Sequence, residues 1–164
     1  LGAHYILAGR VHTGDVRMEK VLYDVLEKIS SDDYLNTHVH YIADYDEKLA
    51  FALSVGSNVA INVPIVGLEA CGTSWEKDIA NFNLLISTHD GGVADGSTAS
   101  YLNVHGMSED EEALELYLRM EEAGAAWRNG FDLETLVREQ LTEFLPIVSG
   151  ARMLRDYLDL LLPE

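Results

Sequence analysis

Residues 59–87 read VAINVPIVGLEACGTSWEKDIANFNLLIS, a stretch that predicts one complete strand–helix–strand unit. The first apolar run is stopped by Pro64, which cannot donate a hydrogen bond to a sheet. A short helix is then expected to end near Ala80, and the second apolar run begins at Leu84. Neither run alternates between apolar and polar residues, and such continuous runs are typical of strands buried in a parallel sheet.

The same pattern occurs upstream. Apolar runs at 4–8 and 38–42 alternate with segments of helical spacing at 16–29 and 46–55. Strands and helices that alternate at this spacing predict right-handed connections and a parallel sheet with helices on both faces. Ligands of such sheets bind in the crevice beyond the carboxyl ends of the strands, so the loops that follow the strands are the candidates for function.

Beyond about residue 107 the pattern becomes helical. Ser108 and Glu111 have the spacing of a capping box, and amphipathic segments follow at 131–144 and 149–162. We therefore expect an α/β protein of two parts. Residues 1–106 would form a Rossmann-like parallel sheet of about four strands, and residues 107–164 a helical C-terminal segment packed on it.

Composition and charge exclude several classes of function. The formal net charge of −17 argues against nucleic acid as a partner, because phosphate binding needs clusters of Lys and Arg. No apolar run approaches the roughly 18 residues of a membrane span, and no secretory signal opens the chain. The single cysteine, Cys71, excludes an internal disulfide and fits a cytoplasmic protein.

The segment 69–77, EACGTSWEK, holds the densest group of residues with chemical potential. Gly72 allows a ligand to approach the backbone closely, and the hydroxyl of Thr73 together with free amides at a helix start suits a phosphate. Lys77 is about one turn into that helix, where partial desolvation would favour an imine with an aldehyde cofactor. Glu69 is free to accept hydrogen bonds from a polyol.

The local sequence alone also allows a structural interpretation. Thr73 and Glu76 have the spacing of a capping box, which leaves Lys77 as a surface residue of an ordinary helix. Elsewhere, His38 and His40 would point to one face of a strand, but a metal site needs a third ligand and none stands at a recognisable spacing. We therefore expect no metal.

Several segments together resemble the α-glucan phosphorylases. EACGT and Lys77 resemble the signature EASGT-x-x-x-K of that family, whose lysine carries pyridoxal phosphate. Residues 44–50, DYDEKLA, resemble its DYD-x-x-LA segment, and residues 9–12, GRVH, its GKAH-type loop. Asp90 and Gly91 match its DG pair, and residues 149–157, SGARMLRDY, resemble the SARRMVREY helix of bacterial members. The chain is thus identified as resembling the C-terminal portion of a glycogen, maltodextrin or starch phosphorylase, an enzyme of GT-B fold.

The resemblance implies a role for each matching residue. Lys77 would hold pyridoxal 5'-phosphate as a Schiff base, Gly72 and Thr73 would bind the cofactor phosphate, and Tyr45 would pack beside the cofactor. Glu69, with the backbone at Cys71 and Gly72, would bind the hydroxyls of a glucosyl unit. Cys71 stands where the family has Ser, which keeps the backbone contact and weakens any hydroxyl role.

The implied reaction is the transfer of α-1,4-linked glucosyl units of a glucan to orthophosphate, which gives glucose 1-phosphate. The family's KR-x-x-x-YK segment, which binds the substrate phosphate, does not occur in this sequence. We therefore expect a fragment that is inactive by itself, whose partner is the N-terminal portion of the same enzyme, in a homo-oligomeric assembly.

Two alternatives remain open. One is a sugar-nucleotide-dependent synthase of GT-B fold, although the Glu-x₇-Glu pair common in those enzymes has Lys77 at its second position here. The other is an α/β interaction module without catalytic activity, which the substitutions at Cys71, Trp75 and Glu76 would allow.

Overall fold

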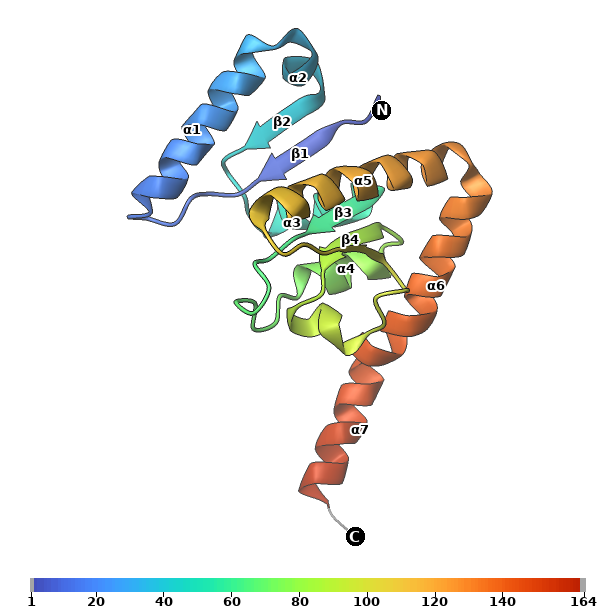
Figure 1. Cartoon of the computed structure of the whole chain (residues 1–164). Helices are drawn as coiled ribbons and strands as arrows, with labels where there is room; N and C mark the ends of the chain where they lie inside the picture. Colours follow the sequence, from blue (N-terminus) through green and yellow to red (C-terminus); the bar gives the residue numbers. More distant parts are fainter. Residues whose placement is uncertain (1, 163–164) are drawn as a thin grey trace. The chain divides into compact units, whose positions relative to one another are not determined.

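The chain divides into two compact units, residues 1–52 and 53–164, and a computed structural model describes residues 2–162 (Figure 1). The first unit contains β1 (Tyr5–Ala8), α1 (Val16–Ser31), α2 (Asp33–His38), β2 (Val39–Ile42) and most of α3 (Glu47–Gly56). Strands β1 and β2 pair in parallel, from Tyr5 with Val39 to Ala8 with Ile42. No residue from 2 to 52 is fully buried, so the unit has little core of its own.

The second unit is built around a three-stranded parallel sheet of order β3-β4-β5. Its elements are β3 (Val59–Asn62), α4 (Ser74–Ala80), β4 (Leu84–Thr88), the 3-10 helix η1 (Gly91–Asp95), β5 (Leu102–Val104), α5 (Glu109–Arg128), α6 (Gly130–Val148) and α7 (Gly150–Leu161). All five residues of the central strand β4 are buried. This strand is the centre of the core.

The two faces of β4 contribute to separate apolar clusters, and residues of α6 pack in both clusters. Leu85 contributes to a cluster with Trp75 and Ile79 of α4 and Phe144 of α6. The neighbouring residues Leu84 and Ile86 belong to a second cluster, which includes residues of β5 and α5. Because successive side chains of a strand point to opposite faces, α4 and α5 lie on opposite sides of the sheet, as Figure 1 shows.

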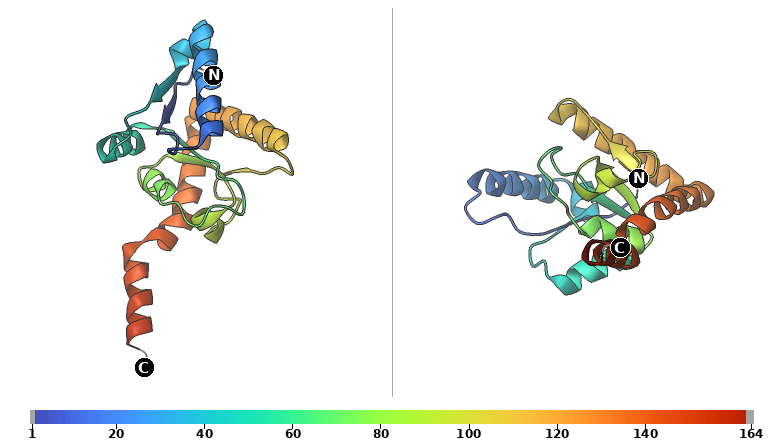
Figure 2. Two further views of the ribbon diagram at one scale, coloured as in Figure 1. Left: turned by 90° about the vertical axis from the view of Figure 1, so that its left-hand side faces the viewer. Right: turned by 90° about the horizontal axis from the view of Figure 1, so that it is seen from below.

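Helix α7 follows α6 after a break at Ser149, whose side chain accepts a hydrogen bond from the amide of Arg152 at 3.1 Å. It projects away from the three-stranded sheet (Figure 2). Its apolar side chains are largely exposed, among them Met153, Leu154 and Tyr157. None of the helices within residues 2–162 combines the length and apolar character needed to cross a membrane.

The expected α/β class, with parallel pairing and a helical C-terminal part, is confirmed. Within residues 2–162 five strands form two hydrogen-bonded sheets, where one sheet of about four strands was expected. Strand β5 escaped prediction because three residues are too few to show a period, and α2 because its six residues form fewer than two turns. The expected domain division near residue 106 stays a prediction.

Candidate functional site

The loops that follow β3 and β4 are joined by one carboxylate. Oδ2 of Asp90, two residues beyond β4, accepts hydrogen bonds from the amide of Gly67 at 2.8 Å and from the amide of Glu69 at 3.1 Å. Hydrogen bonds from backbone amides, chiefly those of Glu69 and Gly91, lower the pKa of the Asp90 carboxyl. The backbone that carries Glu69 is therefore tied to the end of the central strand.

Two glycines bring the same loops into close contact. Gly91 has φ +53°, and a Cβ placed on it would lie 2.8 Å from Cγ of Glu69. A Cβ on Gly92 would lie 3.0 Å from Cζ2 of Trp75 and 3.1 Å from Sγ of Cys71. A larger residue at Gly91 would require the side chain of Glu69 to shift and would be strained at this positive φ, and one at Gly92 would require the side chains of Trp75 and Cys71 to give way slightly.

Glu69 and Gly72 also lie together. A Cβ on Gly72 would be 3.7 Å from Oε1 of Glu69, which is ordinary contact distance. The absence of a side chain at residue 72 therefore leaves open space beside the Glu69 carboxylate. Both residues are partly exposed, and Cys71 between them is an exposed free thiol.

Helix α4 presents Lys77 to the surface. Trp75 and Ile79 are buried and one turn apart, and Lys77 is about 200° around the helix from Trp75. The expectation that Lys77 is partly desolvated is therefore wrong, because the buried face of α4 is the face opposite Lys77. Within residues 2–162 its amine has no ion-pair partner, which leaves it available for covalent chemistry.

The capping box expected from Thr73 and Glu76 is not formed. Thr73 is the N-cap residue of α4, but its φ and ψ of −111° and −1° are not those of an extended cap, and its side chain makes no capping hydrogen bond. The capping part of the structural interpretation was therefore wrong, whereas Lys77 does lie at the surface, as that interpretation had it. The exposed hydroxyl of Thr73 remains available to a ligand.

Tyr45 belongs to the first unit, where two of the resembling segments meet. Arg10, after β1, donates to the carbonyl of Ala43 at 3.2 Å and to Oδ1 of Asp44 at 2.7 Å, both after β2. The Arg10–Asp44 pair is exposed and contributes little to stability. Tyr45 follows with an exposed side chain. The loop after β1 lines a shallow pocket of about 430 Å³.

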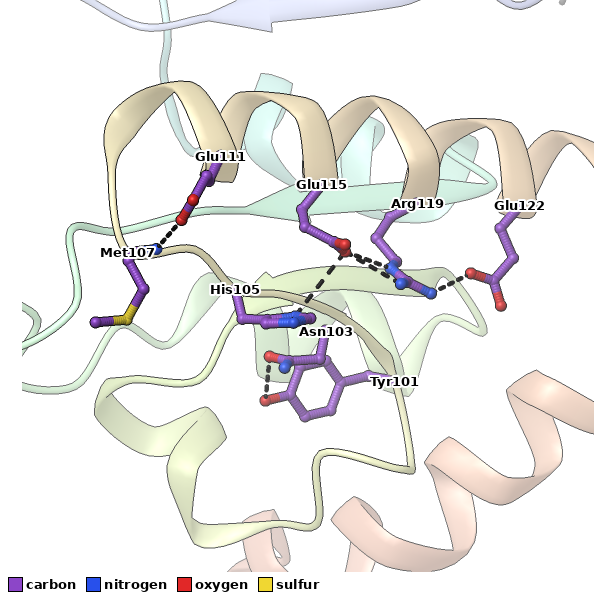
Figure 3. Close-up of polar contacts among 8 residues, drawn as sticks. All are labelled: Tyr101, Asn103, His105, Met107, Glu111, Glu115, Arg119 and Glu122. Carbon is purple, nitrogen blue, oxygen red and sulfur yellow. Dashed lines mark hydrogen bonds and ion pairs between the residues drawn. The ribbon is translucent and has the colours of Figure 1, made fainter.

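Two other polar clusters lie outside these loops. In the first unit, Nδ1 of His4 lies 3.1 Å from Nε2 of His40, and His4 stacks on His38. No group of three or more His, Cys, Asp or Glu among the described residues is arranged to hold a metal ion. Beyond β5, Arg119 bridges Glu115 and Glu122 along α5 (Figure 3), which forms a salt-bridged helix face.

The sequence did not reveal the role of Asp90. The resemblance matched it to the family's DG pair, and the residue also follows an apolar strand, where a crevice loop is expected. The tie from its carboxylate to the amides of Gly67 and Glu69 spans more than 20 positions, and no local pattern specifies such a contact.

The fold of the chain is similar to that of a domain of a GT-B glycosyltransferase. A structure described as the catalytic domain of starch synthase IV from Arabidopsis thaliana, bound to ADP and acarbose, matches with a TM-score of 0.53. The match covers 84% of this chain and 34% of that one, and the two are 13% identical in sequence. It establishes the fold alone.

In sequence, the chain resembles the α-glucan phosphorylases over nearly its whole length, although no family model matches it. Glycogen phosphorylase of Aquifex aeolicus is 27% identical in an alignment of 171 positions, gaps included, that covers 94% of this chain and 24% of that protein. Glycogen phosphorylase of Mycobacterium tuberculosis (strain ATCC 25618 / H37Rv) is also 27% identical, over 94% of the chain and 20% of that protein. The cytosolic alpha-glucan phosphorylase 2 of Arabidopsis thaliana is 33% identical over 49% of the chain and 10% of that protein. The chain thus spans at most about a quarter of these relatives.

Proposed function

We propose that this chain supplies the cofactor-binding part of an α-glucan phosphorylase, which transfers α-1,4-linked glucosyl units to orthophosphate to give glucose 1-phosphate. The observation that carries the proposal is the position of the EACGT-x₃-K segment. It connects β3 to α4 at the carboxyl end of a parallel sheet, where such folds bind ligands. The similarity of nearly the whole chain to glycogen phosphorylases supports the same conclusion.

The residues present fit pyridoxal 5'-phosphate. Lys77 offers an exposed amine without an ion-pair partner among the described residues, so the aldehyde of the cofactor could reach it. Thr73 has a hydroxyl that no capping bond occupies, and Gly72 leaves the backbone accessible, so this pair suits the phosphate of the cofactor. Tyr45, exposed in the first unit, is assigned to the same cofactor by resemblance alone.

Glu69 is proposed to bind the glucosyl unit. Its carboxylate stands beside the open space at Gly72, and together with the amides at Cys71 and Gly72 it offers acceptors and donors to sugar hydroxyls. The bound cofactor would supply a phosphate group as the acid–base partner of the substrate phosphate. This chain's residues would orient the sugar against that group and help to exclude water.

Because the chain covers about a quarter of the relative's length, we expect it to be inactive by itself, and activity should be tested in a hybrid protein. In this hybrid, the chain replaces the matching quarter of Aquifex aeolicus glycogen phosphorylase. The assay is release of glucose 1-phosphate from maltodextrin with orthophosphate.

A homo-oligomeric state of the complete protein remains part of the proposal, to be measured by sedimentation of the hybrid.

In the hybrid, Lys77→Ala should abolish phosphorolysis, because the cofactor loses its attachment. Glu69→Gln should lower kcat/KM about 10- to 100-fold, as expected for the loss of a hydrogen bond to a charged group. Lys48→Ala, which changes an exposed lysine of α3, is the matched control and should leave the rate unchanged. Full activity without Lys77 would contradict the proposal, and turnover that requires a nucleotide sugar instead of orthophosphate would favour the synthase alternative.

A further inference from the structure

Asp90 contacts the loop that carries Glu69 at two points, on either side of one residue. Its Oδ2 atom accepts hydrogen bonds from the amides of Gly67 and Glu69, the residues before and after Leu68. Gly67 has φ +86°, a conformation that a residue with a side chain rarely adopts. The backbone turn before Glu69 is therefore closed onto one carboxylate from the end of β4.

The two glycines that follow Asp90 also lie close to this segment. The backbone of Gly91 lies against the side chain of Glu69, since a Cβ there would come within 2.8 Å of Glu69 Cγ and 3.6 Å of Cys71 Cα. Gly92 lies against the indole of Trp75, which is 2% exposed. The position of Glu69 thus depends on the Asp90–Gly91–Gly92 segment, although these residues are some 20 positions away in sequence.

We propose that Asp90 is a positioning residue for the glucosyl-binding loop: its carboxylate holds the amides of Gly67 and Glu69, which fixes the direction of the Glu69 side chain. The assignment of a sugar to Glu69 rests on the proposed function. The hydrogen bonds from the amides of Gly67 and Glu69 to Asp90, here called the loop tie, do not depend on the proposed function. Asp90 is expected to act only through Glu69 and its loop, without touching substrate.

The first test measures hydrogen exchange of backbone amides in the 164-residue chain. Asp90→Ala should raise exchange at Gly67 and Glu69 about tenfold or more, because two amides lose a charged acceptor, and Asp90→Asn should give a smaller rise. Exchange within β4 should not change. Asp95→Asn, which alters an exposed acid of η1, is the matched control and should have no effect at either amide. Unchanged exchange at Gly67 and Glu69 in both Asp90 variants would overturn the proposal.

The second test uses the hybrid protein and asks whether Asp90 acts through Glu69. Asp90→Asn should lower kcat/KM about tenfold in the otherwise unchanged hybrid and much less in a Glu69→Gln background, because coupled residues are not additive. Additive losses would overturn the positioning role, since a purely structural effect would be the same in both backgrounds.

The two tests separate this inference from the proposed function. If the exchange result holds but no form of the hybrid releases glucose 1-phosphate, the loop tie is supported and the phosphorylase assignment fails. If the hybrid is active and Glu69→Gln impairs it while Asp90→Asn changes neither exchange nor rate, the assignment stands and the role of Asp90 is refuted.

Discussion

Tyr101 lies in the core of the second unit with its hydroxyl against the loop after β4. Its hydroxyl is 2.8 Å from Nδ1 of His89 and donates to Oδ1 of Asn103 at 3.4 Å, and the residue is 5% exposed. Burial raises the pKa of the Tyr101 phenol to about 12. The folded state therefore favours the neutral phenol, whereas in unfolded chains the phenol loses its proton from about pH 10 upward.

Tyr101 should make the stability of the protein sensitive to alkaline pH. A raised pKa gives stability that is fully present below about pH 10 and is lost as pH rises toward and through 12. Urea unfolding between pH 8 and 11.5 should show a falling free energy, and Tyr101→Phe should flatten that fall. Tyr117→Phe, at a tyrosine that is 65% exposed, should leave it unchanged. An identical slope in Tyr101→Phe would show that another group causes the fall.

At the scale of elements, Gln140 links α6 to the central strand. Its Oε1 accepts from the amide of Leu85 at 2.8 Å, and its Nε2 donates to the carbonyl of Asn83 at 2.8 Å. Strand β5 begins opposite Ile86, so it does not reach these groups at the start of β4. The side-chain amide of Gln140 takes the place of a neighbouring strand there, and the residue is fully buried.

Replacing Gln140 should therefore be costly. Gln140→Leu would leave a buried amide and a buried carbonyl without partners, at a cost of roughly 2–4 kcal/mol in the free energy of unfolding. Gln140→Glu keeps an acceptor and loses the donor, so its cost should be measurable as well. The control is Glu139→Leu, at an exposed position of the same helix, expected within about 0.5 kcal/mol of the parent chain. Equal stability of Gln140→Leu and Glu139→Leu would refute this role.

The sequence predicted some elements and contacts of the fold but not others. The runs that became β3 and β4 were predicted because buried parallel strands are continuously apolar. The roles of Glu69 and Lys77, inferred from their residue types and from the family resemblance, stay predictions. The contacts of Asp90 and Gln140 were not predicted. Both join residues more than 20 positions apart, and only the assembled sheet brings such residues together.

At the scale of the whole molecule, the two units differ in their cores. All residues of β4 in the second unit are buried, whereas residues 2–52 of the first unit include none that is fully buried. A two-stranded sheet is marginal in water without further packing. This difference, like the coverage of about a quarter of the relative's length, is the reason to test function in a completed protein.

The most direct test of the central claim is the site of cofactor attachment in the hybrid protein. After saturation with pyridoxal 5'-phosphate, borohydride reduction and peptide mapping should place the adduct on Lys77. The other lysines of the chain, Lys20, Lys28 and Lys48, are also exposed and serve as internal controls for unspecific labelling. The account predicts nearly complete labelling of Lys77 and little on the controls, and loss of the adduct from this chain in Lys77→Ala. An unmodified Lys77, or labelling spread evenly over all of these lysines, would contradict it.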